Sequence, residues 1–410
     1  MLIRQRIVRQ TLLVLYFLLS YDGIQGEIKL SKLEDSELEK QLKLLNKPAI
    51  KTIKTKYGDT YDCVNFYKQP AFDHPLLKNH NFHPKMKPSL VRTVQDSDTS
   101  TANKSASIWL KEKGCPSGTV PIKRVTKDDL IRQKHIPPPE DRAFESTLSN
   151  VRYCYPKSLL ILKNHFLLAI VQIPYNPSNK FAGAGMSANL WNPRIESQQH
   201  TACRLKIQKG SDILQVGWRV DPTLYRDTKT RSFIHFQAGN THCFNTLCPG
   251  FVIVNSKYPV DASFDTIQQR GGKQVWEITM FIERDIANGN WWLLYDENNE
   301  QVGFWPAKIF TKLSSFANNV EWGGVSYSPP GVSEPPMGSS CFPVGDPNYD
   351  AYCRRLNVLN DKGQTVHIYK TKVGVTDPHH YGVMDVPHWR GGKFQHMAFY
   401  GGPGGFQTLC

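Results

Sequence analysis

The sequence predicts an all-β protein preceded by a smaller α+β segment, and three observations lead to this fold class. From about residue 165 onward, short apolar runs alternate with glycine, proline, asparagine and aspartate, which is typical of a sandwich or barrel and not of βαβ units. Before them, leucines recur at helical spacing over residues 28–47. The run Pro137-Pro138-Pro139 then indicates a stiff linker between the two parts. The predicted strands span 166–173, 201–208, 213–221, 232–238, 250–256, 274–283, 290–296, 301–306, 320–328, 353–359 and 365–371.

The first residues have the pattern of a secretory signal peptide. Three arginines precede the apolar run Leu12–Leu19, which is too short to cross a bilayer as a helix. We therefore expect residues 1–26 to be removed by cleavage near Gly26. The alternative, a buried N-terminal helix, fits the three arginines poorly.

The overall charge of the chain is basic. The 410 residues carry a formal net charge of +14, and their mean hydropathy of −0.43 excludes a membrane bundle. The lysines are scattered and no nucleic-acid-binding motif is present. We interpret the charge as a source of solubility and non-specific adhesion, not as a binding code.

The segment before the linker contains one predicted helix and one predicted loop. In the helix over residues 28–47, Ser31 and Glu34 make a capping box. Residues 94–107 are polar and serine-rich, which predicts a mobile loop. This loop carries an N-x-S sequon, so Asn103 is the predicted glycosylation site.

Cysteines and histidines bear on disulfides and metals. All nine cysteines follow the predicted cleavage site, and none belongs to a Cys-x-x-Cys motif. An oxidising route favours disulfides, and an odd number leaves at least one thiol free or paired with another chain. The 13 histidines show no zinc-type spacing, and we interpret His379-His380 as a loop pair. The sequence therefore predicts no metal site and no cofactor.

Short sequence motifs in both parts of the chain resemble those of a known family. Before the linker these are QLKLLNKPAIKTIKT, YKQPAFDHPLLKNH and CPSGTVPIKR. After it they are AGAGMSANLWNP, VGWRVDPTLY, TRSFIHF, CFNTLCPGFV, GNWWLLY, GFWPAKIF, EWGG and YGGPGG. In this order they resemble the activation peptide and the domain of the neprosin family, which are secreted plant glutamic peptidases that cut next to proline.

The resemblance implies a fold and a division of the chain. The expected fold is an antiparallel β-sandwich of two large sheets, with a groove on one concave face. We expect a signal peptide over 1–26, an activation peptide over 27–135, a linker over 136–160 and the neprosin domain over 161–410.

We predict three disulfides, Cys63–Cys115, Cys243–Cys248 and Cys341–Cys353. The first would lie within the activation peptide. For the second, a separation of five residues permits a tight loop, and the family word suggests it. The third pair flanks the turn-rich link Gly345–Asn348. The odd thiol then lies among Cys154, Cys203 and Cys410.

The resemblance also places two catalytic positions. A glutamic peptidase needs a carboxylate as general base and a second group that holds the oxyanion. The resemblance puts the first glutamate in a word like Ile-Glu-Ala-Gly-Trp and the second after Trp-Gly-Gly. This chain has Gln215 and Val325 at those positions. A glutamine can donate to an oxyanion, whereas a valine neither transfers protons nor forms hydrogen bonds.

Strand alternation predicts the surroundings of these positions. It turns Gln215 toward the groove, and Glu321 shares a face with Val325. Glu321 lies four residues from Val325, about 13 Å along the strand, which we expect to be too far for it to replace the missing base. We take Gln215 and Glu321 as the candidate catalytic residues, with a solvated surface acid as the alternative for Glu321. The predicted groove residues are Trp218, Arg219, Gly323, Gly324 and Tyr327, and Glu277 on another strand is a further candidate.

Two functions remain in competition. One is a secreted zymogen peptidase for proline-containing substrates. The other is a catalytically impaired relative that binds a peptide or cell-wall polymer in the same groove, and Val325 favours it. A lectin is a third hypothesis by fold analogy. The aromatic pairs Trp291-Trp292 and Phe304-Trp305 suggest carbohydrate stacking, but core packing accounts for them better.

The expected partners follow from these hypotheses. They are a peptide or proline-rich protein and, through the basic charge, acidic cell-wall polysaccharide. No nucleic acid and no membrane partner is expected after signal cleavage. The expected location is extracellular, in the apoplast or cell wall.

Overall fold

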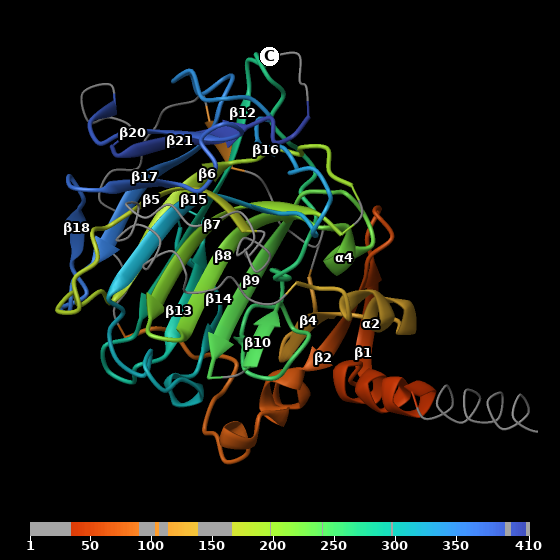
Figure 1. The fold of residues 1–410 in the computed structure, drawn as a ribbon. Helices are drawn as coiled ribbons and strands as arrows, with labels where there is room; N and C mark the ends of the chain where they lie inside the picture. The colour runs from red at the N-terminus through yellow and green to blue at the C-terminus, as the bar shows by residue number, and fades with distance from the viewer. Residues whose placement is uncertain are drawn as a thin grey trace, which may run out of the picture.

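The computed structural model describes residues 34–89, 103–105, 114–137 and 166–406, except 197, 240, 297 and 390–394, with only the backbone given for 103–105. Within these residues the chain forms two large β-sheets, with a small third sheet at one side (Figure 1). The predicted all-β fold, an antiparallel sandwich preceded by a small α+β segment, is confirmed. The predicted signal peptide and almost all of the predicted linker lie outside the described residues.

One layer of the sandwich has seven strands among the described residues, each antiparallel to its neighbours. In spatial order they are β10 (Thr241–Phe244), β9 (Arg231–Ala238), β8 (Asp212–Val220), β7 (His200–Lys209), β15 (Asn319–Tyr327), β5 (Phe166–Gln172) and β19 (Lys372–Val375). This order puts β7 between β8 and β15. A short helix, α4 (Pro222–Tyr225), follows β8.

The other layer has eleven strands among the described residues. Its main path runs β11 (Val252–Ile253), β14 (Glu300–Trp305), β13 (Trp291–Tyr295), β12 (Val275–Arg284), β6 (Gly183–Asn189), β17 (Ala351–Leu359), β21 (Met397–Gly402) and β16 (Met337–Gly338). Three strands pair beside this path, and they are β18 (Thr365–His367) on β17, β20 (Gly382–Val386) on β21 and β3 (Asn103–Ser105) on β12. The predicted loop around Asn103 therefore contains a strand.

The described residues from 34 to 137, which we call the N-terminal block, lie against the sandwich, with α2 (Lys127–Gln133) near α4 (Figure 1). The block holds a helix over residues 34–45 and the sheet of β1 (Ala49–Lys54), β2 (Thr60–Asn65) and β4 (Thr119–Lys123). Three 3₁₀ turns lie at Phe66–Lys68, Pro70–Asp73 and Pro75–Leu77. No helix in the described part of the chain is long and apolar enough to cross a membrane.

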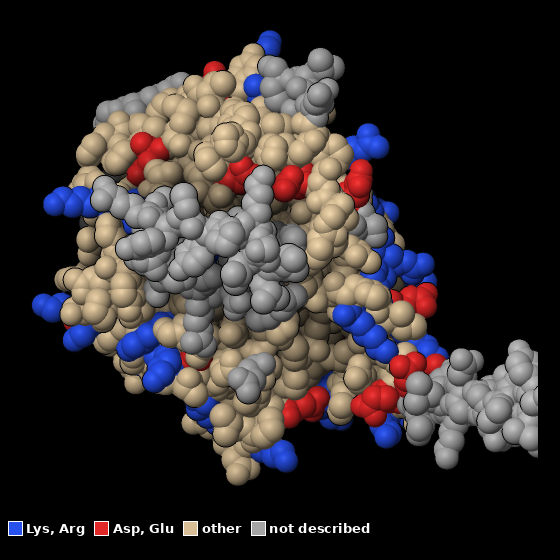
Figure 2. All heavy atoms as spheres, viewed as in Figure 1, with Lys and Arg blue, Asp and Glu red and all other residues tan. Residues whose placement is uncertain are grey.

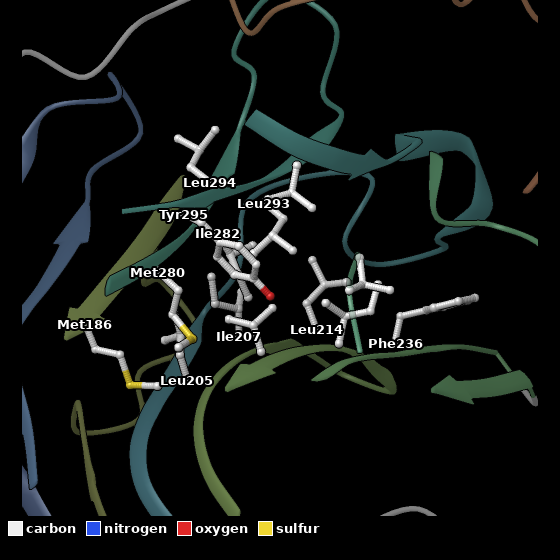
Figure 3. Packing of buried hydrophobic residues seen from close by; sticks show 14 of the residues in the cluster. Met186, Leu205, Ile207, Leu214, Phe236, Met280, Ile282, Leu293, Leu294 and Tyr295 are labelled. Atoms are coloured by element: carbon white, nitrogen blue, oxygen red, sulfur yellow. The ribbon is translucent and has the colours of Figure 1, made fainter. Parts of the chain in front are cut away.

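The main core lies between the two large sheets. Leu205, Ile207 and Leu214 from the seven-stranded sheet point toward Met280 and Ile282 of the eleven-stranded sheet (Figure 3). Alternation within each strand explains this, because every second side chain faces the opposing sheet. Complete burial of one such side chain contributes about 1.5–3 kcal/mol.

The aromatic pairs belong to this core. Trp291, Trp292, Phe304 and Trp305 are fully buried. Cross-strand pairing brings Trp292 opposite Phe304, with ring centroids 4.7 Å apart. The core-packing interpretation of these residues is correct, and their suggested role in carbohydrate stacking is wrong.

Two of the predicted disulfides are confirmed and one is wrong. Cys63–Cys115 lies within the N-terminal block, with Cα atoms 5.4 Å apart, and Cys243–Cys248 closes a local loop, with Cα atoms 5.9 Å apart. Cys341 is disulfide-bonded, but Cys353 is a free thiol, so the predicted Cys341–Cys353 bond is absent. Turn composition between these two cysteines does not bring their side chains together, because Cys353 points into the core from β17.

The actual neighbour of Cys353 is Cys203, which lies on β7 in the other sheet. Their Sγ atoms are 3.1 Å apart, and both side chains are buried. Burial, together with the contact to Cys203, raises the pKa of the Cys353 thiol well above its ordinary value. The thiolate that exchange chemistry needs is therefore disfavoured once the sheets have packed.

We expect these two thiols to be joined during oxidative folding, before the sheets close. An external disulfide, such as oxidised glutathione, would accept the two electrons and two protons. Closing a loop of 150 residues would stabilise the fold by about 5 kcal/mol in the chain-entropy model. Peptide mapping without reduction should find the cross-link. Alkylation of both cysteines in unreduced, denatured protein would contradict it.

The N-terminal block docks on the sandwich through buried polar contacts. Asp59, just before β2, accepts a hydrogen bond from Arg231 Nη1 of the sandwich at 2.8 Å. Lys123, in the same block as Asp59, lies 3.0 Å from this carboxylate. Tyr61 donates to Asp261 at 3.0 Å. Gln69 donates to the Ile253 carbonyl at 3.1 Å and accepts from the same residue's N–H at 2.8 Å. The Cys63–Cys115 bond does not cross this interface.

The Asp59 ion pairs predict that acid weakens the docking. Burial raises the pKa of Asp59, but Lys123 and Arg231 outweigh burial, so the net pKa lies below its ordinary value. A lowered carboxyl pKa stabilises the folded form above the unfolded value of about 4, and this contribution is lost as pH falls below it. Asp261 works in the opposite direction, because its pKa is raised by burial.

Hydrogen exchange in the intact chain can measure this. Asp59→Asn should speed amide exchange in β2 at neutral pH, since it removes the carboxylate that ties Arg231 Nη1 to the N-terminal block. Asp227 still pairs with Arg231, so the expected loss is that of one charged hydrogen bond, about 1.5–3 kcal/mol. Asp62→Asn is the matched control, because Asp62 pairs with Arg124 inside the block. Equal protection of β2 in wild type at pH 7 and pH 3 would contradict the prediction.

Candidate active site

The candidate site lies on the outer face, by which we mean the face of the seven-stranded sheet that is turned away from the eleven-stranded sheet. On β8, Val216 and Trp218 are in the main core, so Gln215 and Arg219 point to the outer face. On β15, Val320 and Trp322 are in the core, so Glu321 also points outward. The predicted orientation of Gln215 agrees with this alternation.

The strand register brings polar residues into one row across this face. Gln215 pairs with Lys206 of β7, and Lys206 pairs with Glu321 of β15. On the other side, Gln215 pairs with His235 of β9, and Glu321 pairs with Gln172 of β5. We call these five residues the polar row.

The register changes the relation of the two catalytic candidates. Gln215 and Glu321 are two strand spacings apart in the same row, about 10 Å between Cα atoms. Val325 is opposite Ala202, which in turn pairs with Arg219, four residues away along the strands. By this register Glu321 lies nearer than Val325 to Gln215.

Glu321 is buried and held by several groups. Arg204 Nη2 donates to its Oε2 at 3.1 Å, while Lys206 Nζ and Asn319 Nδ2 donate to its Oε1 at 3.2 and 3.1 Å. Its side chain is only 4% exposed, so the interpretation as a solvated surface acid is wrong. Two cations at this distance favour the ionised carboxylate.

The other half of the row is uncharged. Among the described residues, nothing forms a hydrogen bond with the buried side-chain amide of Gln215. Burial lowers the pKa of the neighbouring His235 far below its ordinary value, and His242, Arg219, Arg204 and Lys206 add to this effect. The ring of His235 is therefore neutral. The carboxylate of Glu321 and the side-chain amide of Gln215 thus lie on the two sides of Lys206 in one row.

Val325 belongs to a separate apolar cluster on the outer face. This cluster consists of Leu168, Ile170, Ala202, Leu224, Tyr225, Phe233 and Val325. Ile136, at the end of the N-terminal block, packs against it. The valine is therefore part of an apolar contact surface, a role that was not predicted from the sequence.

Comparisons with known proteins complete this picture. The chain matches the Neprosin family over residues 197–403 and the Neprosin activation peptide over residues 52–154. It belongs to the neprosin family. The neprosin chain thus has the two-part organisation of a zymogen, an activation peptide followed by the Neprosin domain.

Solved structures give weaker likenesses. A scytalido-glutamic peptidase with a peptide-based transition state analogue is 12% identical, with 58% of this chain and 98% of that chain covered and a TM-score of 0.31. SCP-B, a member of the Eqolisin family in complex with the tripeptide Ala-Ile-His, is 11% identical, with the same coverage and a TM-score of 0.32. CG-16, a homodimeric agglutinin from chicken liver, is 9% identical, with 38% and 92% covered and a TM-score of 0.21.

The predicted groove residues of this chain divide between the two faces of the seven-stranded sheet. Trp218 lies in the core, where its indole donates to the Asn189 carbonyl at 2.9 Å. A Cβ on Gly324 would lie 2.4 Å from the Met337 sulfur, which is also in the core. Both predictions are wrong for the same reason, since alternation turns these residues away from the polar row.

The other three predicted groove residues have the parity of the outer face. Gly323 pairs with Arg204. Its φ is +132°, and an added Cβ would lie 2.5 Å from the Ala169 carbonyl, so only glycine fits here. Arg219 donates to Asp221 at 2.8 Å. Tyr327 stacks on His200, with centroids 5.3 Å apart.

Glu277 does not join the polar row. It lies on β12 in the other sheet, where Arg354 donates to both its carboxylate oxygens at 2.7 and 2.8 Å. Tyr352 also donates to this carboxylate. This closed arrangement gives Glu277 a structural role.

The histidine pair lies in a turn near a different acidic group. His380 Nδ1 lies 2.9 Å from Asp377 and 3.9 Å from Glu334, and all three side chains are partly exposed. Nothing further at this position points to an ion, so we assign it no metal.

Sequence reasoning missed Arg204, Lys206 and His235. A signal for the first two was present, because the run Arg204-Leu205-Lys206-Ile207 alternates cationic and apolar residues in a strand. His235 shares its strand face with Phe233, so the sequence pattern makes it look like a core residue.

The cluster around Val325 predicts the effect of a charge at that position. Val325→Glu should lower the stability by several kcal/mol, because an unpaired carboxylate would replace a buried valine between Leu168 and Ala202. Val325→Ile is the apolar control, and its extra methylene should cost about 1–3 kcal/mol, less than the buried charge. Thermal unfolding measures both, and an unchanged midpoint for Val325→Glu would contradict the assignment.

Proposed function

We propose that this chain is the secreted zymogen of a glutamic endopeptidase, in which Glu321 is the general base and Gln215 is the oxyanion donor. The observation that carries the proposal is the register of β8, β7 and β15, which aligns the two residues across one strand. A peptide lying over β7 would have a carboxylate on one side and an amide N–H on the other.

The chemistry needs a base that is ionised and a donor that is free. The ion pairs with Arg204 and Lys206 favour the carboxylate form of Glu321, which suits a base that works in acidic solution. The carboxylate would take a proton from water as the water attacks the peptide carbonyl. The Gln215 amide would then donate to the oxygen that becomes negative, and the Lys206 charge nearby would add to its stabilisation.

The zymogen part of the proposal rests on the N-terminal block. Ile136, followed by the buried Pro137, packs on the apolar cluster beside the polar row. An Ile-Pro segment of the activation peptide thus covers a surface that an apolar or proline-containing substrate would use. This contact and the family resemblance support substrates that contain proline.

The proposed extracellular location rests on the two disulfides and on the predicted signal peptide. Figure 2 shows lysine and arginine side chains spread around the visible face without forming one patch, so cell-wall polysaccharide is not part of the proposal.

The alternative is a catalytically impaired relative that binds peptides without cutting them. Its motivation was Val325, and the register weakens it because Glu321 stands closer to Gln215. A closed zymogen with a tightly paired Glu321 would still favour binding without cleavage, so activity must be measured after the linker has been cut.

Cleavage of a proline-rich protein at acidic pH, followed by mass spectrometry, tests the proposal. Glu321→Gln should lower kcat/KM by about 10²–10⁴, because the base is lost. Gln215→Ala should lower it by about 10²–10³, because an oxyanion donor is lost.

Glu277→Gln is the matched control. It also removes a buried glutamate from an arginine pair, so it should reduce stability but leave kcat/KM of the folded fraction unchanged. Full activity of Glu321→Gln would show that the base lies elsewhere. Absence of cleavage with measurable peptide binding would favour the impaired relative.

A further inference from the structure

A second group of polar residues lies beside the polar row, at the β9–β10 edge of the outer face. The strands pair so that His242 is opposite Gln237 and Phe244 is opposite His235. Ile234, Phe236 and Cys243 of the same strands face the main core. Alternation therefore places His235, Gln237 and His242 together on the outer face.

These three side chains share an unusual property. Both ring nitrogens of His235, Oε1 of Gln237 and Nδ1 of His242 are buried, and among the described residues they have no hydrogen-bond partner. His235 itself is only 3% exposed. A buried polar group without a partner costs about 1–3 kcal/mol, so four such atoms in one place need a reason.

The position connects this group to the proposed chemistry. His235 is the direct cross-strand neighbour of Gln215, one strand spacing away, about 5 Å. Its ring lies 6.0 Å from that of His242 and 4.5 Å from that of Phe244, measured between centroids. The polar side chains of His235, Gln237 and His242 and the ring of Phe244 thus lie together next to the proposed oxyanion donor.

The charge state of these side chains limits which chemical group can bind beside them. Burial lowers the pKa of both His235 and His242, and each neutral ring offers one N–H donor and one nitrogen acceptor. The Gln237 oxygen adds an acceptor. Arg204, Lys206 and Arg219 act on His235 as nearby positive charges, which disfavours a cationic guest.

We propose that His235, Gln237 and His242 form a subsite that binds the primary amide of a glutamine or asparagine side chain in the peptide substrate. A primary amide has two N–H donors and a carbonyl acceptor, so it can pair with the acceptors and donors of all three residues. This inference rests on the proposed peptidase function and specifies which substrate residue is preferred near the cut bond.

Peptide pairs that differ at one position test the subsite. Matched peptides carry glutamine, glutamate, lysine or leucine at each position next to the cut bond, and both kcat/KM and Kd are measured with the chain cleaved in its linker. At one position, the glutamine peptide should exceed the leucine and lysine peptides by about tenfold or more, because leucine leaves the buried polar atoms unpaired. Preference for glutamate over glutamine would overturn the amide assignment.

Variants separate the subsite from general damage. His235→Phe and the milder His242→Phe should each bring the glutamine-to-leucine ratio close to one. His200→Phe is the matched control, because His200 is also buried with a strongly lowered pKa on the outer face, but lies in a different row. It should keep the ratio.

The outcomes distinguish the two proposals. If peptides are cut with equal kcat/KM for glutamine and leucine at every position, the subsite is wrong and the peptidase stands. If nothing is cut but the glutamine peptide binds at least tenfold more tightly than its leucine partner, the subsite stands and the peptidase is wrong. Equal Kd values together with no cleavage would overturn both.

Discussion

Two indole hydrogen bonds to one strand hold the arrangement on which the site depends. Trp218 of β8 donates to the Asn189 carbonyl at 2.9 Å, and Trp322 of β15 donates to the Gly185 carbonyl at 3.1 Å. Both acceptors lie on β6 in the opposing sheet. Because both tryptophans are fully buried, neither strand can slip by one residue without turning an indole out of the core. The same constraint keeps Gln215 and Glu321 on the outer face and in one row.

The outer face is a compromise between charge and burial. Arg204, Lys206 and Glu321 are all buried, and their ion pairs offset the cost of removing them from water. An active site that must keep a carboxylate ionised gains from such cations, although they also make the carboxylate a weaker base. Stability and reactivity therefore pull in opposite directions at Glu321, and the position of Lys206 between the two candidates sets the balance.

Local patterns predicted β5, β7, β8, β9 and β15, which carry the candidate site, and the short disulfide loop, because these depend on residues that are close in sequence. Register was not predictable, since the pairing of β7 with β15 joins residues more than 100 positions apart. The separation of Glu321 and Val325 by four residues on one strand face was predicted correctly. Only the register shows which of the two lies in the same row as Gln215. Cys353 was misassigned for the same reason, because its neighbour Cys203 comes from the other sheet. The strand β6 was missed because Gly183 and Gly185 hide the apolar alternation; an added Cβ on Gly185 would lie 2.1 Å from the Phe281 ring.

The presence of valine at position 325 is consistent with a working site once the activation peptide is considered. Ile136 packs against the cluster that contains Val325, while the Asp59–Arg231 pair anchors the same block at β9. A glutamate at 325 would face this apolar contact with an unpaired charge and would weaken the closed form. A valine strengthens it instead. Val325 therefore belongs to the apolar surface on which the activation peptide packs, and Glu321, the base that we propose, lies four residues away on the same strand face, in the row of Gln215.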